Sequence, residues 1–139
     1  DLNKDFYGEK LSDVLMKPTK IYVKSILSLI EKINVHAMAH ITGGGIIENL
    51  PRVLPVHLCA KINKNSWELP HLFQWLKDEA NLDDTELYKI FNCGIGMAII
   101  VDEKDAQEAS NLLRELGEEV YIIGRIEQSD KDEHQVKII

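Results

Sequence analysis

The residues most able to do chemistry stand together in the sequence HITGGG, residues 40–45. Three consecutive glycines carry a large cost in backbone entropy, so an ordered run of them indicates positive φ angles or the close approach of a ligand. A short helical pattern follows over residues 46–50, and Thr42 is placed to cap that helix. The free N–H groups and the dipole of such a helix suit a phosphate. The spacing also fits a tight turn without a ligand.

His40 adds a titratable side chain to this loop. It lies near the end of an apolar segment, residues 35–41, which we predict to be a strand leading into the glycines. Alternation places His36 and His40 on the same face of that strand. Either histidine fits a residue whose hydrogen bonds are satisfied within the fold. His40 differs because it adjoins the position of a ligand, so we take it as a candidate functional residue.

A second glycine-bearing sequence, FNCGIGM, occupies residues 91–97 and leads into an unbroken apolar run over residues 97–101. Such a run is typical of a central strand that is covered on both faces. The loop before it either faces the same ligand as the first loop or is a tight turn between a helix and a strand. A nucleophilic role for Cys93 is disfavoured, because no histidine or acid stands beside it in the sequence.

Two helices that should position these loops have clear sequence signals. An amphipathic helix is predicted over residues 20–33, with its apolar stripe packed on a sheet. The stripe consists of Ile21, Ile26, Leu27, Ile30 and Ile33. Asp83 and Glu86 have the spacing of a capping box for a short helix that ends near Phe91.

The remaining elements complete one domain over residues 1–139. Helices are expected from residue 69 onward and over residues 103–116, and strands over residues 56–62, 119–126 and 134–139. Residues 1–18 are expected to be a frayed N-terminal segment, with a docking or linking segment as the alternative. The order of elements predicts an α+β fold in which helices cover a mixed sheet.

The composition fits one globular domain of this size. The 139 residues are 45% hydrophobic and 28% charged, with a net charge of −7, which argues against a nucleic-acid surface. No apolar run reaches the length that spans a membrane. The two cysteines lack metal-ligand spacing and are expected to be reduced thiols in a cytoplasmic protein, with a disulfide between them as the alternative. The chain starts with neither a signal peptide nor an initiator methionine, so we expect a piece of a longer protein.

Four sequences stand in the chain in a family-like order and spacing: PTKIYVKS at residues 18–25, HITGGG at 40–45, ENLPRVLP at 48–55 and FNCGIGM at 91–97. Together they resemble the C-terminal half of the phosphoribosylformylglycinamidine cyclo-ligase family, also called aminoimidazole ribonucleotide (AIR) synthetase. The match runs from about residue 8 to residue 139, without departure at the motif positions. The resemblance implies a ferredoxin-like sheet with helices on its faces, which covers a cleft between two halves of the enzyme.

The resemblance also implies an activity and its partners. The family closes formylglycinamidine ribonucleotide to 5-aminoimidazole ribonucleotide in de novo purine synthesis, while ATP is converted to ADP and phosphate. Mg2+ accompanies ATP, because phosphoryl transfer needs its charge neutralised. In the family, the N-terminal half supplies most of the ATP site and the main contact of a homodimer. No nucleic-acid or membrane partner is implied, and no metal ligand is assigned to this chain.

The resemblance assigns the candidate site to nine residues. His40 falls on the cleft-facing histidine of the family, which implies a general acid/base or substrate-positioning role. Arg52 is implied to contact a substrate phosphate, with a salt bridge beneath the loop as the alternative. The implied substrate or phosphate contacts are Thr42, Gly43, Gly44, Gly45, Asn49, Arg52, Asn92 and Cys93.

Two other classes of function stay open at this point. One is a related enzyme of the same superfamily, such as formylglycinamidine ribonucleotide synthase, selenophosphate synthetase or thiamine monophosphate kinase. These enzymes share the architecture but not the motif at residues 18–25 together with that at 91–97. The other class is a non-catalytic assembly domain, which the loop chemistry argues against.

The chain alone is expected to fold but not to turn over ATP. Its sequence provides helix caps, a core and complete strands, yet no Walker-type phosphate loop and no carboxylate pair for magnesium. The purified chain should therefore show a cooperative thermal transition and no ATP hydrolysis when the ribonucleotide is added. Hydrolysis that depends on the ribonucleotide would contradict this expectation.

Overall fold

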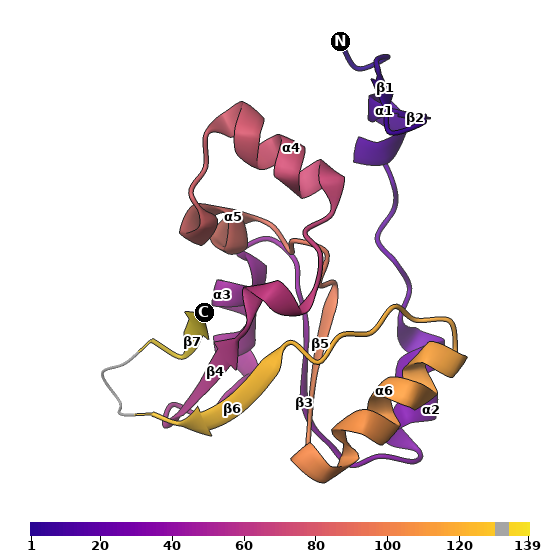
Figure 1. The fold of residues 1–139 in the computed structure, drawn as a ribbon. Coiled ribbons are helices and arrows are strands. Elements are labelled where there is room, and N and C mark those ends of the chain that lie inside the picture. Colours follow the sequence, from indigo (N-terminus) through magenta and orange to yellow (C-terminus); the bar gives the residue numbers. More distant parts are fainter. Residues whose placement is uncertain (130–133) are drawn as a thin grey trace.

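The computed structural model describes residues 1–129 and 134–139 (Figure 1). The strands are β1 (Asp5–Phe6), β2 (Glu9–Lys10), β3 (Val35–His40), β4 (Leu58–Ile62), β5 (Met97–Val101), β6 (Gly124–Gln128) and β7 (Val136–Ile138). The α-helices are α1 (Leu11–Leu15), α2 (Val23–Ile30), α3 (Gly45–Asn49), α4 (His71–Ala80), α5 (Asp84–Ile90) and α6 (Ala106–Glu115). Short 3-10 turns are η1 (Leu50–Val53), η2 (Lys64–Ser66) and η3 (Glu103–Asp105). The predicted α+β class is confirmed.

The strands hydrogen-bond in three groups rather than in one continuous sheet. β3 pairs antiparallel with β5, and β1 with β2. β4 lies between β6, to which it is antiparallel, and β7, to which it is parallel. The pairing is therefore mixed, as predicted. Side-chain packing rather than backbone hydrogen bonds joins the groups, because residues from β3, β4 and β5 share one core cluster.

Two clusters of buried side chains cover opposite faces of the β3–β5 pair. The larger cluster includes Ala39, Ala98 and Ile46, and it extends to β4, α3 and α5. The smaller cluster packs Leu29 of α2 and Leu113 of α6 against Val35, Ile99 and Val101. Figure 1 shows α2 and α6 together on one side of the pair. The predicted strand over residues 97–101 is confirmed and packs on both faces, but among the described strands it pairs with β3 alone, so it is not central in a sheet.

The helix predicted over residues 20–33 is shorter, and it buries a different face. It begins at Val23, because the preceding residues run along a cavity instead of turning into the helix. Ser25 and Leu29 are buried, whereas Ile21, Leu27 and Ile30 are 83%, 53% and 44% exposed. The apolar repeat alone could not identify this face, since the position of α6 decides which residues are covered. The strand predicted from residue 119 likewise begins only at Gly124.

Residues 1–17 are ordered, so the expectation of a frayed segment is wrong. They form the β1–β2 hairpin and α1, and they contact α4. The ring of Tyr7 stacks on His71 at 4.0 Å, and Phe6 meets Trp75 edge-on at 5.8 Å. The ammonium group of Lys4 lies 4.8 Å from the centre of the Trp75 ring. These contacts fit the alternative of a docking segment.

Among the described helices, none combines the length and the apolar composition that crossing a bilayer requires.

Asp84 stands at the start of α5 and links this helix to η2 and α4 through ion pairs. Its carboxylate forms ion pairs with Lys64 of η2 at 2.7 Å and with Lys77 of α4 at 2.6 Å. The hydrogen bond from Lys64, followed by that from Lys77, lowers the pKa of Asp84 from 3.8 to about 2. The ionised carboxylate therefore stabilises the fold above its unfolded-state pKa, and this contribution is lost as the pH falls through the folded-state pKa.

The thermal stability of the chain should depend on Asp84 in acid. Between about pH 4 and about pH 2, the Tm of the wild type should fall more steeply than that of Asp84→Asn, which lacks the titrating group. At pH 7 the variant should lose no more than about 1 kcal/mol, because the ion pairs are largely exposed. Asp78→Asn is a matched control, since the carboxylate of Asp78 accepts a hydrogen bond from neutral Gln74. Equal slopes for wild type and Asp84→Asn would contradict the assignment.

Candidate functional site

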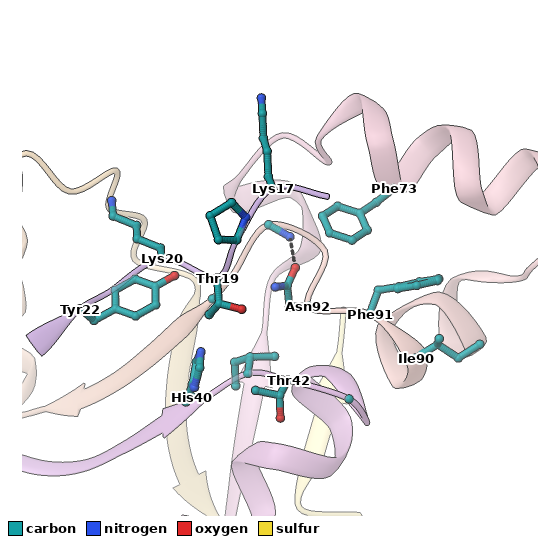
Figure 2. Close-up of a pocket in the computed structure, with 15 residues that line it drawn as sticks. Lys17, Thr19, Lys20, Tyr22, His40, Thr42, Phe73, Ile90, Phe91 and Asn92 are labelled. Carbon is teal, nitrogen blue, oxygen red and sulfur yellow. Dashed lines mark hydrogen bonds between the residues drawn. The ribbon is translucent and has the colours of Figure 1, made fainter. Parts of the chain in front are cut away.

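A cavity of about 510 Å3 lies where three of the four motif sequences meet (Figure 2). The segment from Lys17 to Tyr22, the end of β3 with the loop after it, and the loop before β5 all line this cavity. In Figure 2, Lys20, Tyr22 and His40 lie on one side, whereas Phe73, Ile90 and Phe91 lie on the other. The cavity therefore has a polar end and an apolar end.

β3 places His40 at the polar end of the cavity. His40 pairs with Met97 of β5 in the antiparallel register, and its side chain is exposed at the cavity. The ring of Tyr22 meets the imidazole edge-on, with 5.9 Å between the ring centres. Within the described part of the chain, no group hydrogen-bonds the imidazole of His40. His36, in contrast, pairs with Asp102 at 3.0 Å. The two histidines therefore differ in their hydrogen bonding, and the nitrogens of His40 are open to the cavity.

The first glycine loop contributes only part of its length to the cavity. Thr42 and Gly43 line it, whereas Gly44 and Gly45 do not. Gly44 and Gly45 have φ angles of 94° and 56°, which glycine adopts without strain. A Cβ atom on Gly45 would lie 2.0 Å from the carbonyl oxygen of Tyr88 in α5. These two glycines therefore allow a sharp turn and the close packing of α3 on α5.

Asn49 stabilises this loop through hydrogen bonds to its backbone. Its side chain is buried, and its Nδ2 donates to the carbonyl oxygens of Thr42, Gly43 and Gly45 at 3.4, 3.2 and 2.8 Å. Asn49 lies outside the cavity lining, so in this structure it fixes the shape of the loop instead of facing a ligand.

The geometry does not favour a phosphate at the N-terminus of the helix that follows the glycines. α3 has five residues, its N-cap is Gly44, and Thr42 makes no side-chain cap. The N–H of Gly45 donates to the carbonyl of Thr42. The carboxylate of Glu48 lies where a Cβ on Gly44 would point, with Oε2 2.6 Å from that position. A nearby carboxylate repels a phosphate, so the anion would have to meet Thr42 and Gly43 at the cavity.

Arg52 and Cys93 lie away from the cavity. Arg52 is exposed on η1, and among the described residues no carboxylate lies within ion-pair distance of it. Cys93 is fully buried, and its thiol donates to the carbonyl oxygens of Leu87 and Phe91 at 3.6 Å. Burial raises the pKa of the Cys93 thiol to about 12, so it stays protonated at neutral pH.

Asn92 does line the cavity, in the loop before β5. Its Oδ1 accepts a hydrogen bond from the N–H of Gly94 at 3.0 Å, as the dashed line in Figure 2 shows. This bond fixes the side chain and leaves the amide NH2 group available to a ligand. Of the predicted contacts, the structure thus brings Asn92, Thr42, Gly43 and His40 together.

Sequence reasoning missed the side chains that residues 17–22 bring to the cavity. Thr19, Lys20 and Tyr22 line its polar end. Lys20 pairs with Glu118 at 2.5 Å, and Glu118 also accepts a hydrogen bond from Ser25 at 2.6 Å. This carboxylate fastens the segment to the turn after α6. The sequence signal for these residues is the pair of polar side chains, Thr19 and Lys20, that follows Pro18 ahead of α2.

The described residues offer no metal centre. Within residues 1–129 and 134–139, no three His, Cys, Asp or Glu side chains are grouped as metal ligands. The polar side chains that line the cavity are neutral donors, two lysines and one imidazole.

Alanine substitutions should distinguish Gly45, where a Cβ atom would collide with α5, from Gly43, where a Cβ atom has space. Gly45→Ala should destabilise the chain by about 2–4 kcal/mol, because it combines a left-handed backbone with a collision at Tyr88. Gly43→Ala should change the stability by less than about 0.5 kcal/mol, since a Cβ there meets nothing within 4 Å. Urea unfolding followed by circular dichroism measures both. Equal losses of stability in the two variants would refute this division of roles.

Comparison with known proteins identifies the family. The family model described as "AIR synthase related protein, C-terminal domain" matches residues 1–137. The phosphoribosylformylglycinamidine cyclo-ligase of Methylobacillus flagellatus is 52% identical over all 139 residues. The enzymes of that name from Burkholderia pseudomallei and Burkholderia mallei are 50% identical over the same length. The chain spans 40% of the length of these relatives. The resemblance is thereby confirmed, and the chain belongs to the AIR synthase related protein family as its C-terminal domain.

Proposed function

We propose that this chain is the C-terminal part of an ATP-dependent cyclo-ligase that converts formylglycinamidine ribonucleotide to 5-aminoimidazole ribonucleotide. The observation that carries the proposal is the convergence of three family motifs on one cavity, in a chain 50–52% identical to cyclo-ligases over its full length. The polar end of the cavity suits the phosphate, ribose, amidine and formamide groups of that substrate, all of which form hydrogen bonds.

His40 would handle a proton or orient the substrate. In the reaction, ATP activates the formamide oxygen, the amidine nitrogen attacks the formamide carbon, and phosphate leaves. The attacking nitrogen gives up a proton as the ring closes. The imidazole of His40 lies at the polar end of the cavity and has no hydrogen-bond partner among the described residues, so it is suited to accept that proton. Thr42, Gly43 and Asn92 would supply hydrogen bonds that hold the substrate beside it.

The magnesium that accompanies ATP does not fit this chain. A divalent ion of this kind is bound by carboxylates together with phosphate oxygens, and the described residues contain no acidic cluster that lines the cavity. We propose that the part of the relatives outside the matched 40% supplies most of the Mg–ATP site. The homodimer and the cytoplasmic location belong to the same proposal. The net charge of −7 supports the absence of a nucleic-acid partner.

The activity is tested directly with the full-length protein that carries this chain. ATP turnover should depend on formylglycinamidine ribonucleotide and should yield 5-aminoimidazole ribonucleotide. Turnover that responds instead to another superfamily substrate would overturn the proposal.

His40→Ala in that full-length enzyme should lower kcat by roughly 10²-fold or more, in the range of one positioned acid/base group. The Tm should change little, because the side chain contributes almost no buried area. His36→Ala is the matched control: this histidine lies on the same strand and pairs with Asp102 outside the cavity. We expect it to keep wild-type kcat. A wild-type kcat in His40→Ala, or a variant that mainly unfolds, would identify His40 as a structural residue.

A further inference from the structure

Tyr22 lines the cavity and contacts both His40 and Gly96. It directly precedes α2, and its ring meets the imidazole of His40 at an interplanar angle of 69°. Figure 2 shows the two rings on the same side of the cavity. Edge-to-face contacts of this kind hold two rings in a defined relative orientation. Neither the family motif nor the proposed chemistry has so far given Tyr22 a role.

Gly96 makes room for the hydroxyl of Tyr22. A Cβ atom on Gly96 would lie 2.0 Å from Tyr22 Oη, 3.1 Å from Cζ and 3.7 Å from Cε2, and these are its three nearest neighbours. The φ angle of Gly96 is not among the positive ones, so backbone conformation does not require glycine here. The carbonyl of Gly96 accepts from the N–H of Ile41 at 2.9 Å. The phenol therefore lies against the backbone that joins the residue after His40 to the start of β5.

The hydroxyl is available to a ligand. No described residue hydrogen-bonds it, although it lies half-buried at the cavity. Burial raises the pKa of Tyr22 above its ordinary value of 10, so the phenol stays protonated at neutral pH and can donate. The Nζ of Lys20 lies 6.0 Å from the ring centre, and its charge is paired with Glu118.

We propose that Tyr22 is a positioning residue of this site: its ring fixes the imidazole of His40, and its hydroxyl donates a hydrogen bond to an oxygen of the bound ribonucleotide. Gly96 is the residue that permits this arrangement. The proposal rests on the proposed function for the identity of the ligand. The contact between Tyr22, His40 and Gly96 does not depend on the identity of the ligand. The positioning role and the proposed function can therefore be refuted separately.

The ring contact is tested by NMR of the His40 ring protons in the 139-residue chain. Tyr22→Phe should leave these signals near their wild-type positions, because the ring remains. Gly96→Ala should move them, because the new Cβ displaces the hydroxyl and with it the ring. The double variant should return them towards wild type, since the nearest remaining atom is then Cζ at 3.1 Å. His36 signals, an internal control on the same strand, should stay constant throughout.

Tyr22→Leu is a second, independent variant for this test. It adds no atoms to the packed contact, so it can be measured even if overpacking prevents Gly96→Ala from folding. It should move the His40 signals by removing the ring current. Unmoved His40 signals in Tyr22→Leu, or no return of the signals in a folded double variant, would overturn the positioning role.

The hydroxyl is tested by kinetics in the full-length enzyme. Tyr22→Phe should raise KM for the ribonucleotide roughly 2- to 10-fold, the effect of one lost hydrogen bond, with kcat within about twofold of wild type. Gly96→Ala should lower kcat about tenfold or more, and adding Tyr22→Phe should restore kcat to the value of Tyr22→Phe alone. Strictly additive effects, or an unchanged KM in Tyr22→Phe, would overturn the proposal. An inactive wild-type enzyme would refute the proposed function instead, while the NMR result still decides the contact.

Discussion

The antiparallel pairing of β3 with β5 is the interaction on which the candidate site depends. Its register sets His40 opposite Met97, and the N–H of Ile41 continues the ladder to the carbonyl of Gly96. The first glycine loop therefore leaves the pair at the end where the second loop enters it. Core clusters cover both faces of the pair, so a shift of register would expose apolar side chains on both sides. This constraint holds two sequence-distant loops beside one cavity.

Close packing explains most of the glycines near that cavity. Gly45 brings the backbone of α3 against the carbonyl of Tyr88, and Gly96 leaves space for the Tyr22 hydroxyl. Both are positions where a side chain would collide with a residue remote in sequence. Glycine-rich loops are often read as phosphate cradles, but here the glycines chiefly shape the walls. The side chains of Thr19, Lys20, Tyr22, His40 and Asn92 supply the polar groups.

The lysines that line the cavity already form ion pairs with carboxylates of the protein. The chain carries a net charge of −7, yet Lys17 and Lys20 line the cavity. Lys17 pairs with Glu9 and Lys20 pairs with Glu118. An anionic ligand would therefore share these cations with carboxylates already in place. In the structure, both lysines therefore have carboxylate partners.

Sequence alone determined the features that depend on neighbouring residues. The apolar runs predicted β3 and β5, the spacing of Asp83 and Glu86 predicted the capping box that the structure confirms, and the four motifs identified the family. Periodicity could not give the buried face of α2, because the position of α6 sets it. Nor could spacing show that Cys93 is buried, or that Tyr22 needs Gly96. Only the tertiary structure decided these points, because each rests on a contact between segments that only folding brings together.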